Sequence, residues 1–299
     1  MNRQPEIVAA TDMSALSLHA VERALLISKA LSGSLTVIHA LGLEDLSLIQ
    51  KLLGKGADEM SETISAKMML ELTDMLTSIG GKHDYKAAIH LEKGQPTTAI
   101  PIFLKDKQAD LLVIGAHGKG FLERILLGST ASNLLSKCTV PVLTVKNPAA
   151  GLYNNVLVAV DFSHQNQHMI QLVRTILPDA HFNFLHVYDL PFEGKLRIAG
   201  VQEQEIHQYR DKVSQESLAF LHDMAREAGL EKWEYSAFVV NGDPTLEIVR
   251  HEKSLNADLI VMGKRGLHLT EELLLGSVTK RVLAESVSDV LVVVPTTEA

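Results

Sequence analysis

Cysteine is almost absent from this chain of 299 residues, which contains a single one, Cys138. An intrachain disulfide is therefore impossible, and a metal cluster held by several thiolates is excluded. A reducing compartment fits such a composition, although one residue is a weak indicator of location.

The chain also lacks the apolar segments that direct proteins to membranes. Residues 1–6 have no apolar core of the kind found in signal peptides, and no apolar run approaches the length that spans a bilayer. We therefore expect a cytoplasmic protein with no membrane span. An excess of basic residues is missing too, because the formal net charge is −8. Nucleic acid is accordingly disfavoured as a partner, while a local basic patch stays open.

Apolar residues are plentiful by comparison. They make up 46% of the chain against 21% charged residues, with nine prolines and no low-complexity run, which is typical of a globular protein with substantial cores. The length suffices for two domains. Strand-like apolar runs alternate with helical spacing throughout, and this alternation predicts an α/β fold with a parallel sheet covered on both faces.

Within each half, short apolar runs predict the strands, and a periodicity near 3.6 residues predicts the helices between them. In the first half, expected strands cover 6–11, 34–39, 85–90, 111–114 and 140–145, and expected helices cover 15–31, 57–79, 96–107 and 130–137. In the second half, expected strands cover 155–161, 182–187, 233–239, 258–262 and 288–295. The long helix of that half, 201–228, is expected to bury a stripe that includes Tyr209 and Phe220.

The two halves are in register with each other. Asp12 and Asp161, at the ends of matching strands, lie 149 residues apart, and the glycines and serine that follow are 148 residues from their counterparts. Such a spacing rarely survives by chance across loops of variable length. We interpret it as a tandem duplication, with domain 1 at 1–147, a short linker, and domain 2 at 152–299.

Each half carries the spacing Gly-x2-Gly-x9-Gly-Ser after its fourth strand, from Gly115 to Ser129 and from Gly263 to Ser277. It is neither a Walker loop nor the dinucleotide fingerprint of a first strand. Open α/β sheets bind ligands at this carboxyl edge, glycine lets the backbone approach a phosphate, and a helix N-terminus supplies N–H groups. The alternative is that the glycines only end a strand and start a helix. We favour this alternative less, because the same spacing occurs twice in register.

On these features the chain resembles a tandem universal stress protein over almost its whole length. Supporting features are the aspartates that end the first strands, the Gly-x-Pro turns at Gly94 and Gly242, and the apolar final strands. The resemblance implies two doubly wound, five-stranded parallel-sheet (Rossmann-like) domains, packed as an internal pseudo-dimer through their last strands. It also implies ATP, bound alone or with Mg²⁺, across the carboxyl ends of the first and fourth strands.

The resemblance assigns ligand contacts to both halves. Asp12 and Asp161 would lie near the ribose or base, and Ala40 and Val187 would offer backbone groups to adenine. The ribose and phosphate contacts it implies are Gly115, Gly118, Arg124, Gly128, Ser129 and Thr130 in the first half, and Gly263, Gly266, Gly276, Ser277 and Val278 in the second.

The nine-residue spacers of the two motifs differ in charge. Arg124 lies where related motifs often carry a basic residue near the phosphates, and its counterpart is Glu272, beside Glu271. The formal charge of the spacer is +1 in the first half and −2 in the second, although Lys264 and Arg265 bring the whole second loop to zero. A carboxylate that faces a polyphosphate weakens binding, so we expect tighter ATP binding in the first half.

Chemistry beyond binding has little support in the sequence. Among thirteen histidines, His164 and His168 have the spacing of a helical metal-ligand pair but no third ligand, and we expect no metal site. No residue is an evident nucleophile or general base for attack on phosphate, so we expect no catalytic residues and at most weak ATP hydrolysis.

The favoured function is an ATP-binding stress or signalling module that acts as a nucleotide-dependent switch on an unidentified protein partner. Two alternatives stay open. One is a slow ATPase or nucleotidyl-transfer enzyme. The other is a binder of a non-nucleotide small ligand or lipid, through the loops at 41–56 and 188–200. A further homodimer is also left open.

Overall fold

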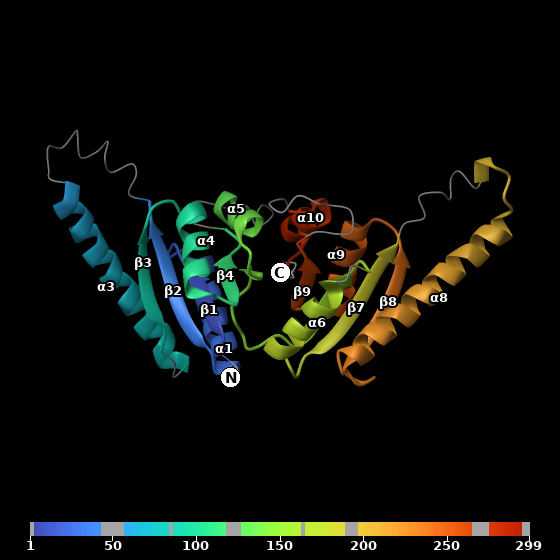
Figure 1. The fold of residues 1–299 in the computed structure, drawn as a ribbon, viewed down its shortest axis with the longest axis horizontal. Coiled ribbons are helices and arrows are strands. Elements are labelled where there is room, and N and C mark those ends of the chain that lie inside the picture. Colours follow the sequence, from blue (N-terminus) through green and yellow to red (C-terminus); the bar gives the residue numbers. More distant parts are fainter. Residues whose placement is uncertain are drawn as a thin grey trace. The chain divides into compact units, whose positions relative to one another are not determined.

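The computed structural model describes residues 3–42, 57–83, 86–117, 127–162, 165–188, 197–264 and 275–294. The chain divides into two compact units, Met1–Leu152 and Tyr153–Ala299. Each unit is an open parallel sheet accompanied by helices (Figure 1). The α/β class and the two doubly wound, five-stranded sheets expected from the sequence are therefore confirmed.

The sheet of the first unit has the strand order β3-β2-β1-β4-β5, with every pairing parallel. Its strands are β1 (Glu6–Ala10), β2 (Ser34–Leu41), β3 (Ala88–Lys93), β4 (Leu111–Gly115) and β5 (Val142–Val145). Its helices are α1 (Ala15–Ala30), α3 (Ala57–His83), α4 (Pro96–Lys107) and α5 (Ser129–Lys137). The strand order reverses between β1 and β4, and such a switch point opens a crevice at the carboxyl ends of the strands.

The second unit repeats this arrangement with the order β10-β9-β6-β7-β8 and the same parallel pairing. Its strands are β6 (Asn155–Val160), β7 (His181–Tyr188), β8 (Tyr235–Asn241), β9 (Leu259–Gly263) and β10 (Asp289–Val293). Its helices are α6 (Gln165–Ile176), α8 (Glu203–Glu227), α9 (Pro244–Leu255) and α10 (Ser277–Glu285). Here the switch point lies between β6 and β9.

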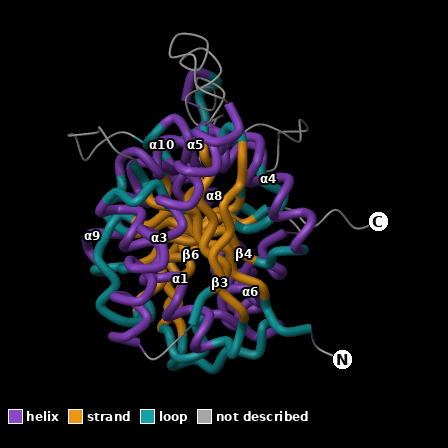
Figure 2. The backbone as a smooth tube through the Cα atoms, turned by 90° about the vertical axis from the view of Figure 1, so that its left-hand side faces the viewer, coloured by secondary structure: helices purple, strands orange, loops and turns teal. Residues whose placement is uncertain are grey.

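The central strands are apolar on both faces because helices cover both sides of a parallel sheet. In the first unit α1 packs with α3, and α4 packs with α5. Figure 2 shows the strands running between the helices. Val8 and Leu112, at the centres of β1 and β4, are 0% exposed. Within the described residues, no helix is long and apolar enough to cross a membrane.

Local sequence sets where the helices begin. Ser14 is the N-cap of α1, and its side chain accepts a hydrogen bond from the Ser17 N–H. Pro96 and Pro244 stand in the first turns of α4 and α9, where a missing N–H costs nothing. These prolines fix the chain direction immediately after β3 and β8.

The edge strands were predicted less well than the central ones. The third strand of each unit begins later than expected. β3 begins at Ala88 instead of residue 85, which itself lies outside the described residues, and β8 begins at Tyr235 instead of residue 233. Trp233 precedes its strand and is 77% exposed. Neither strand has a fully buried residue, so their sequences lack a sharp apolar pattern that would fix their ends.

The predicted stripe of α8 was wrong for Tyr209. That side chain is 50% exposed and Phe220 is 40% exposed, whereas Ser217 and Leu221 lie on the buried face. Residues 217, 221 and 224 follow helical spacing from the buried Ile206, and Tyr209 lies off this line. The buried face of α8 therefore includes the small polar residue Ser217 and does not include the predicted Tyr209.

Candidate functional site

A cavity of about 550 Å³ lies at the carboxyl ends of β1, β2 and β4 in the first unit. Its volume falls in the range of about 300–1,000 Å³ that is typical of small-molecule sites. The residues that line it are Ala10, Thr11, Asp12, Ser17, His39, Ala40, Pro96, Ile100, Ile114, Gly115, Ala116, His117, Gly128, Ser129, Thr130, Ala131 and Leu134. The cavity therefore coincides with the switch point of this sheet.

Most of the residues predicted for the first half meet in this cavity. Asp12 and Ala40 come from the ends of β1 and β2, Gly115 from the end of β4, and Gly128, Ser129 and Thr130 from the start of α5. Gly118 and Arg124 lie outside the described residues, and their part in the site stays a prediction.

The turn from β1 into α1 holds Asp12 by a network of short-range hydrogen bonds. The Ser14 N–H donates to Asp12 Oδ1 at 3.0 Å, and the hydroxyls of Thr11 and Ser17 share a hydrogen bond of 2.9 Å. Met13 has a φ of 60°, in the left-handed region that side chains seldom adopt. This turn fixes the Asp12 carboxylate at the rim of the cavity.

His39 is a lining residue that the sequence analysis did not assign to the ligand. Its Nδ1 lies 2.7 Å from the carbonyl oxygen of Thr11, and because a carbonyl only accepts, Nδ1 must donate. The bond ties the end of β2 to the end of β1 and fixes the imidazole ring beside the cavity. The recurrence of a histidine at the same place in both halves, His39 and His186, was the signal that could have found it.

Gly115 has a packing role as well as a lining role. A Cβ at this position would lie 3.0 Å from the Leu16 carbonyl carbon and 3.0 Å from the Ser17 nitrogen, both in the backbone of α1. Glycine therefore lets α1 approach the end of β4 closely. Gly115 thus has a structural role that does not depend on a ligand.

Backbone hydrogen bonds hold the described residues that follow β4 and precede α5. The Ala116 N–H donates to the Val145 carbonyl at 2.9 Å, and the Gly128 N–H donates to the Ala116 carbonyl at 2.9 Å. The Gly128 N–H is thus used within the protein. As the N-cap of α5, Gly128 makes no side-chain cap bond. The N–H groups of the first turn, which have no acceptors within the helix, can therefore meet an anion from outside.

His117, which falls within the motif between Gly115 and Gly118, also lines the cavity, although the sequence analysis gave it no role. Burial, and secondarily the positive charge of Lys146, lower the pKa of His117 from its ordinary value of 6.5. The ring is therefore neutral at pH 7, so it offers the cavity a polar group without a positive charge.

The second unit reproduces the backbone frame of the first. The Lys264 N–H donates to the Val293 carbonyl at 2.8 Å, the Gly276 N–H donates to the Lys264 carbonyl at 3.0 Å, and Gly276 caps α10 without a side-chain bond. Of the predicted residues, Gly263 ends β9, Val187 lies in β7, Asp161 follows β6, and Ser277 and Val278 start α10. Gly266, Glu271 and Glu272 lie outside the described residues, and so does the comparison of Arg124 with Glu272.

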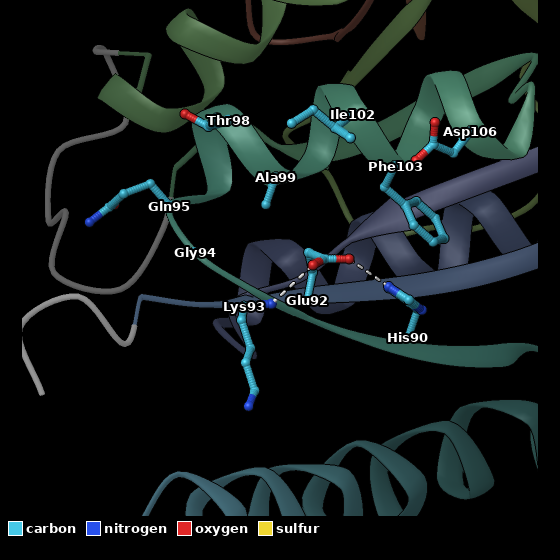
Figure 3. A pocket seen from close by; sticks show the side chains of 10 residues that line it. All are labelled: His90, Glu92, Lys93, Gly94, Gln95, Thr98, Ala99, Ile102, Phe103 and Asp106. Atoms are coloured by element: carbon cyan, nitrogen blue, oxygen red, sulfur yellow. Dashed lines mark hydrogen bonds and ion pairs between the residues drawn. The ribbon is translucent and has the colours of Figure 1, made fainter. Parts of the chain in front are cut away.

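A second cavity of the first unit, about 510 Å³, lies between β3 and α4 (Figure 3). Two of its polar side chains, His90 and Glu92, pair with each other. His90 Nε2 lies 2.9 Å from Glu92 Oε2, and the Lys93 N–H donates to Glu92 Oε1 at 3.3 Å. The His90 ring also stacks on Phe103, with 4.3 Å between the ring centroids. This internal pairing makes it a weaker candidate than the cavity at the switch point.

Two doubly wound units, the first with a ligand-sized cavity at its switch point, define a tandem α/β protein. The model of the Universal stress protein family matches residues 5–146 and again residues 152–294. The chain therefore belongs to the universal stress protein family. The tandem resemblance found in the sequence is confirmed.

Individual relatives match one unit or the whole chain. A universal stress protein of Methanocaldococcus jannaschii is 32% identical over 147 residues, which cover 49% of this chain and 85% of the relative. Another, YxiE of Bacillus subtilis, is 29% identical over 48% of this chain and 99% of its own length. The crystal structure of a universal stress protein from Archaeoglobus fulgidus covers 98% of this chain and 99% of its own, with 23% identity and a TM-score of 0.65. That similarity extends the shared fold to the full tandem chain.

Proposed function

We propose that this chain binds an adenine nucleotide, ATP, in the cavity of its first unit and acts as a nucleotide-dependent binding module in a stress response. The observation that carries the proposal is the composition of the cavity wall. An uncapped helix N-terminus lies at one side, and a fixed carboxylate and a fixed imidazole come from the ends of β1 and β2.

The lining residues suit the three parts of a nucleotide. The Ser129 hydroxyl and the N–H groups of the first turn of α5 match the phosphates. The Asp12 carboxylate can accept hydrogen bonds from ribose hydroxyls, a role that acidic residues have in related α/β folds. Next to it, the backbone of Ala40 and the ring of His39 suit the base. Mg²⁺ prefers carboxylate and phosphate oxygens, and Asp12 supplies a carboxylate to this wall.

The same lining favours binding over hydrolysis. Attack on a phosphate needs a positioned base or nucleophile within hydrogen-bonding distance. One oxygen of Asp12 accepts the Ser14 N–H, and Nδ1 of His39 donates to the Thr11 carbonyl, which leaves Nε2 as an acceptor. These bonds fix the orientation of both groups, which suits recognition of a ligand and supports a switch or binding module whose output depends on nucleotide occupancy.

Calorimetry with ATP on single variants tests the proposal. Gly128→Val places a branched side chain at the N-cap of α5, and we expect binding to weaken at least about tenfold, ~1.4 kcal/mol. Gly276→Val, the matching change at α10, should cost less affinity. Gly81→Ala, in the exposed part of α3 with no atom within 4 Å of its added Cβ, should leave binding unchanged. Absence of ATP binding by the unaltered chain, or a greater loss in Gly276→Val, would contradict the proposal.

A further inference from the structure

His39 uses a backbone acceptor at the end of β1 that a continuing sheet would use itself. The Thr11 N–H donates to the Ile38 carbonyl at 3.0 Å. In the regular series of a parallel ladder, the next bond would run from the Ala40 N–H to the Thr11 carbonyl. Nδ1 of His39 donates to that carbonyl instead, at 2.7 Å. Thr11 is only 6% exposed, so its carbonyl needs a partner within the protein, and the imidazole supplies one.

The N–H and C=O groups of Ala40 face the side of β1. The Ile38 carbonyl faces β1, whereas the Leu41 carbonyl accepts the Gly94 N–H at 2.9 Å on the side of β3. Alternate residues of a strand turn their peptide groups to opposite neighbours, so both groups of Ala40 point toward β1. Among the described residues, neither group has a hydrogen-bond partner there. Because Ala40 lines the cavity, a donor and an acceptor lie side by side at its wall.

The second unit has the same arrangement at the end of its second strand. Nδ1 of His186 donates to the Val160 carbonyl at 2.8 Å. The Tyr188 carbonyl accepts the Gly242 N–H at 3.2 Å, as the Leu41 carbonyl accepts the Gly94 N–H. The exchange of a ladder bond for an imidazole bond is therefore a feature of both units.

The base of a nucleotide fits the β2 end of the first cavity. α5, whose first turn suits the phosphates, follows β4, and the strand order puts β2 two positions away from β4. Neighbouring strands are 4.7–4.9 Å apart in general, so the two ends of the site are separated by roughly 10 Å. Pro96 and Ile100 of α4 line the cavity, and α4 packs on β2. These side chains offer apolar surface to a flat base beside Ala40.

An adjacent donor and acceptor match one edge of adenine, on which N1 accepts a hydrogen bond and the 6-amino group donates one. Hypoxanthine, the base of inosine triphosphate (ITP), has an N1–H and a 6-oxo group on that edge. Against Ala40 its donor would face a donor and its acceptor an acceptor. Polar groups that are desolvated and left unpaired in this way cost binding free energy.

We infer that His39 is a positioning residue for recognition of the base: its Nδ1–H takes the Thr11 carbonyl and so keeps the N–H and C=O of Ala40 available to the edge of adenine. This inference rests on the proposed function, because it supposes that the first cavity holds an adenine nucleotide. It assigns His39 a role that acts through Ala40.

Calorimetry of the full chain with ATP and with ITP tests the inference. All proteins carry Gly276→Val, which weakens any contribution from the second unit. With His39 intact, we expect ATP to bind at least about tenfold more tightly than ITP, ~1.4 kcal/mol. His39→Leu should weaken ATP binding about tenfold and bring the ratio of the two affinities close to one, ~1.4 kcal/mol. A loss of ATP binding through general damage to the fold would not by itself move that ratio.

Two further variants separate the Nδ1–H from the rest of the ring. His39→Asn keeps a side-chain N–H near the position of Nδ1, and we expect it to retain the preference for ATP. His90→Leu makes the same replacement at a half-buried histidine of β3, outside the cavity, and should leave both affinities unchanged. An equal loss of preference in His39→Asn and His39→Leu would overturn the inference.

Amide hydrogen exchange of the unaltered chain, followed by NMR after labelling of alanine with ¹⁵N, needs no variant to fold. Without nucleotide, the Ala40 N–H should exchange much faster than that of Ala9, which is 0% exposed in the centre of the sheet. ATP should slow the exchange of Ala40, and ITP should do so less. Protection of Ala40 equal to that of Ala9 before nucleotide is added would overturn the inference.

The outcomes separate the inference from the function on which it rests. Absence of ATP binding by the unaltered chain would remove both. Binding of ATP with no preference over ITP, or an unchanged preference in His39→Leu, would overturn the inference and leave nucleotide binding standing.

Discussion

At the scale of single residues, the two matching histidines hold the first and second strands of each unit together at the site. His39 is half-buried beside an open cavity, whereas His186 is 8% exposed and covered by Phe162. Burial lowers the pKa of His186 from 6.5, while the hydrogen bond to the Val160 carbonyl and the charge of Asp161 act in the opposite direction. The same residue type is thus more deeply buried in the second unit than in the first.

The lowered pKa of His186 predicts a loss of stability in acid. Above pH 6.5 the ring is neutral in both the folded and unfolded chain, and it contributes no pH dependence. As the pH falls below 6.5, the unfolded chain takes up a proton that the folded chain resists, so stability declines until the folded pKa is passed. We expect His186→Gln to reduce the fall in melting temperature between about pH 7 and pH 5. His207→Gln, at an exposed histidine of α8, is the control, and an equal effect of both variants would contradict the prediction.

At the scale of elements, the contact between α1 and the end of β4 shapes the cavity wall. α1 begins at Ala15, after its N-cap Ser14 and the turn that fixes Asp12, and it passes against Gly115. The glycine therefore couples the helix position to the strand end, and both surfaces of this contact line the site through Ser17 and Gly115.

Gly115→Ala is predicted to destabilise the first unit. Its Cβ would lie 3.0 Å from two backbone atoms of α1, and backbone cannot rotate away as a side chain can. Overpacking of this kind costs about 1–3 kcal/mol. Urea unfolding should show the loss, with Gly81→Ala as the control that gains up to about 1 kcal/mol from helix propensity. A stability equal to that of the unaltered chain would mean that α1 can shift without cost.

At the scale of the whole molecule, two copies of one fold have diverged in side chains while keeping their backbone frame. The loop-closing bonds of Ala116 and Gly128 recur at Lys264 and Gly276 with nearly the same lengths. The side chain directly after the fourth strand differs, because the first unit has Ala116 there and the second has the buried Lys264.

The charge difference between the two loops predicts unequal effects of matched substitutions. Arg124→Glu should weaken ATP binding severalfold by placing a carboxylate near the phosphates, whereas Glu272→Arg should change it less. The effect of Arg124→Glu should shrink at high salt, because exposed charges are screened over about 8–10 Å. Calorimetry at two salt concentrations measures this, with Lys212→Glu on the exposed face of α8 as the control. An effect of Arg124→Glu that is independent of salt would contradict an electrostatic role.

The α/β class and the tandem repeat could be predicted from the sequence, and so could six of the residues that line the cavity of the first unit. Apolar periodicity is a local property, and it located the central strands because these are buried on both faces. The register of 148 residues linked the halves, and the motif pointed to the ends of β1 and β4. Edge strands were misplaced by two or three residues because a half-buried strand carries little pattern.

Which side chains meet at the cavity depends on how distant elements pack together. Ser17, His39 and His117 come from three separate segments, and nothing in their spacing brings them to one cavity. The packing role of Gly115 depends on a helix about one hundred residues earlier in the chain. Phe162 lies on His186 and against Phe220 because a left-handed turn, a strand end and a distant helix converge there. Contacts of this kind are set by the packing of elements, which local sequence does not encode.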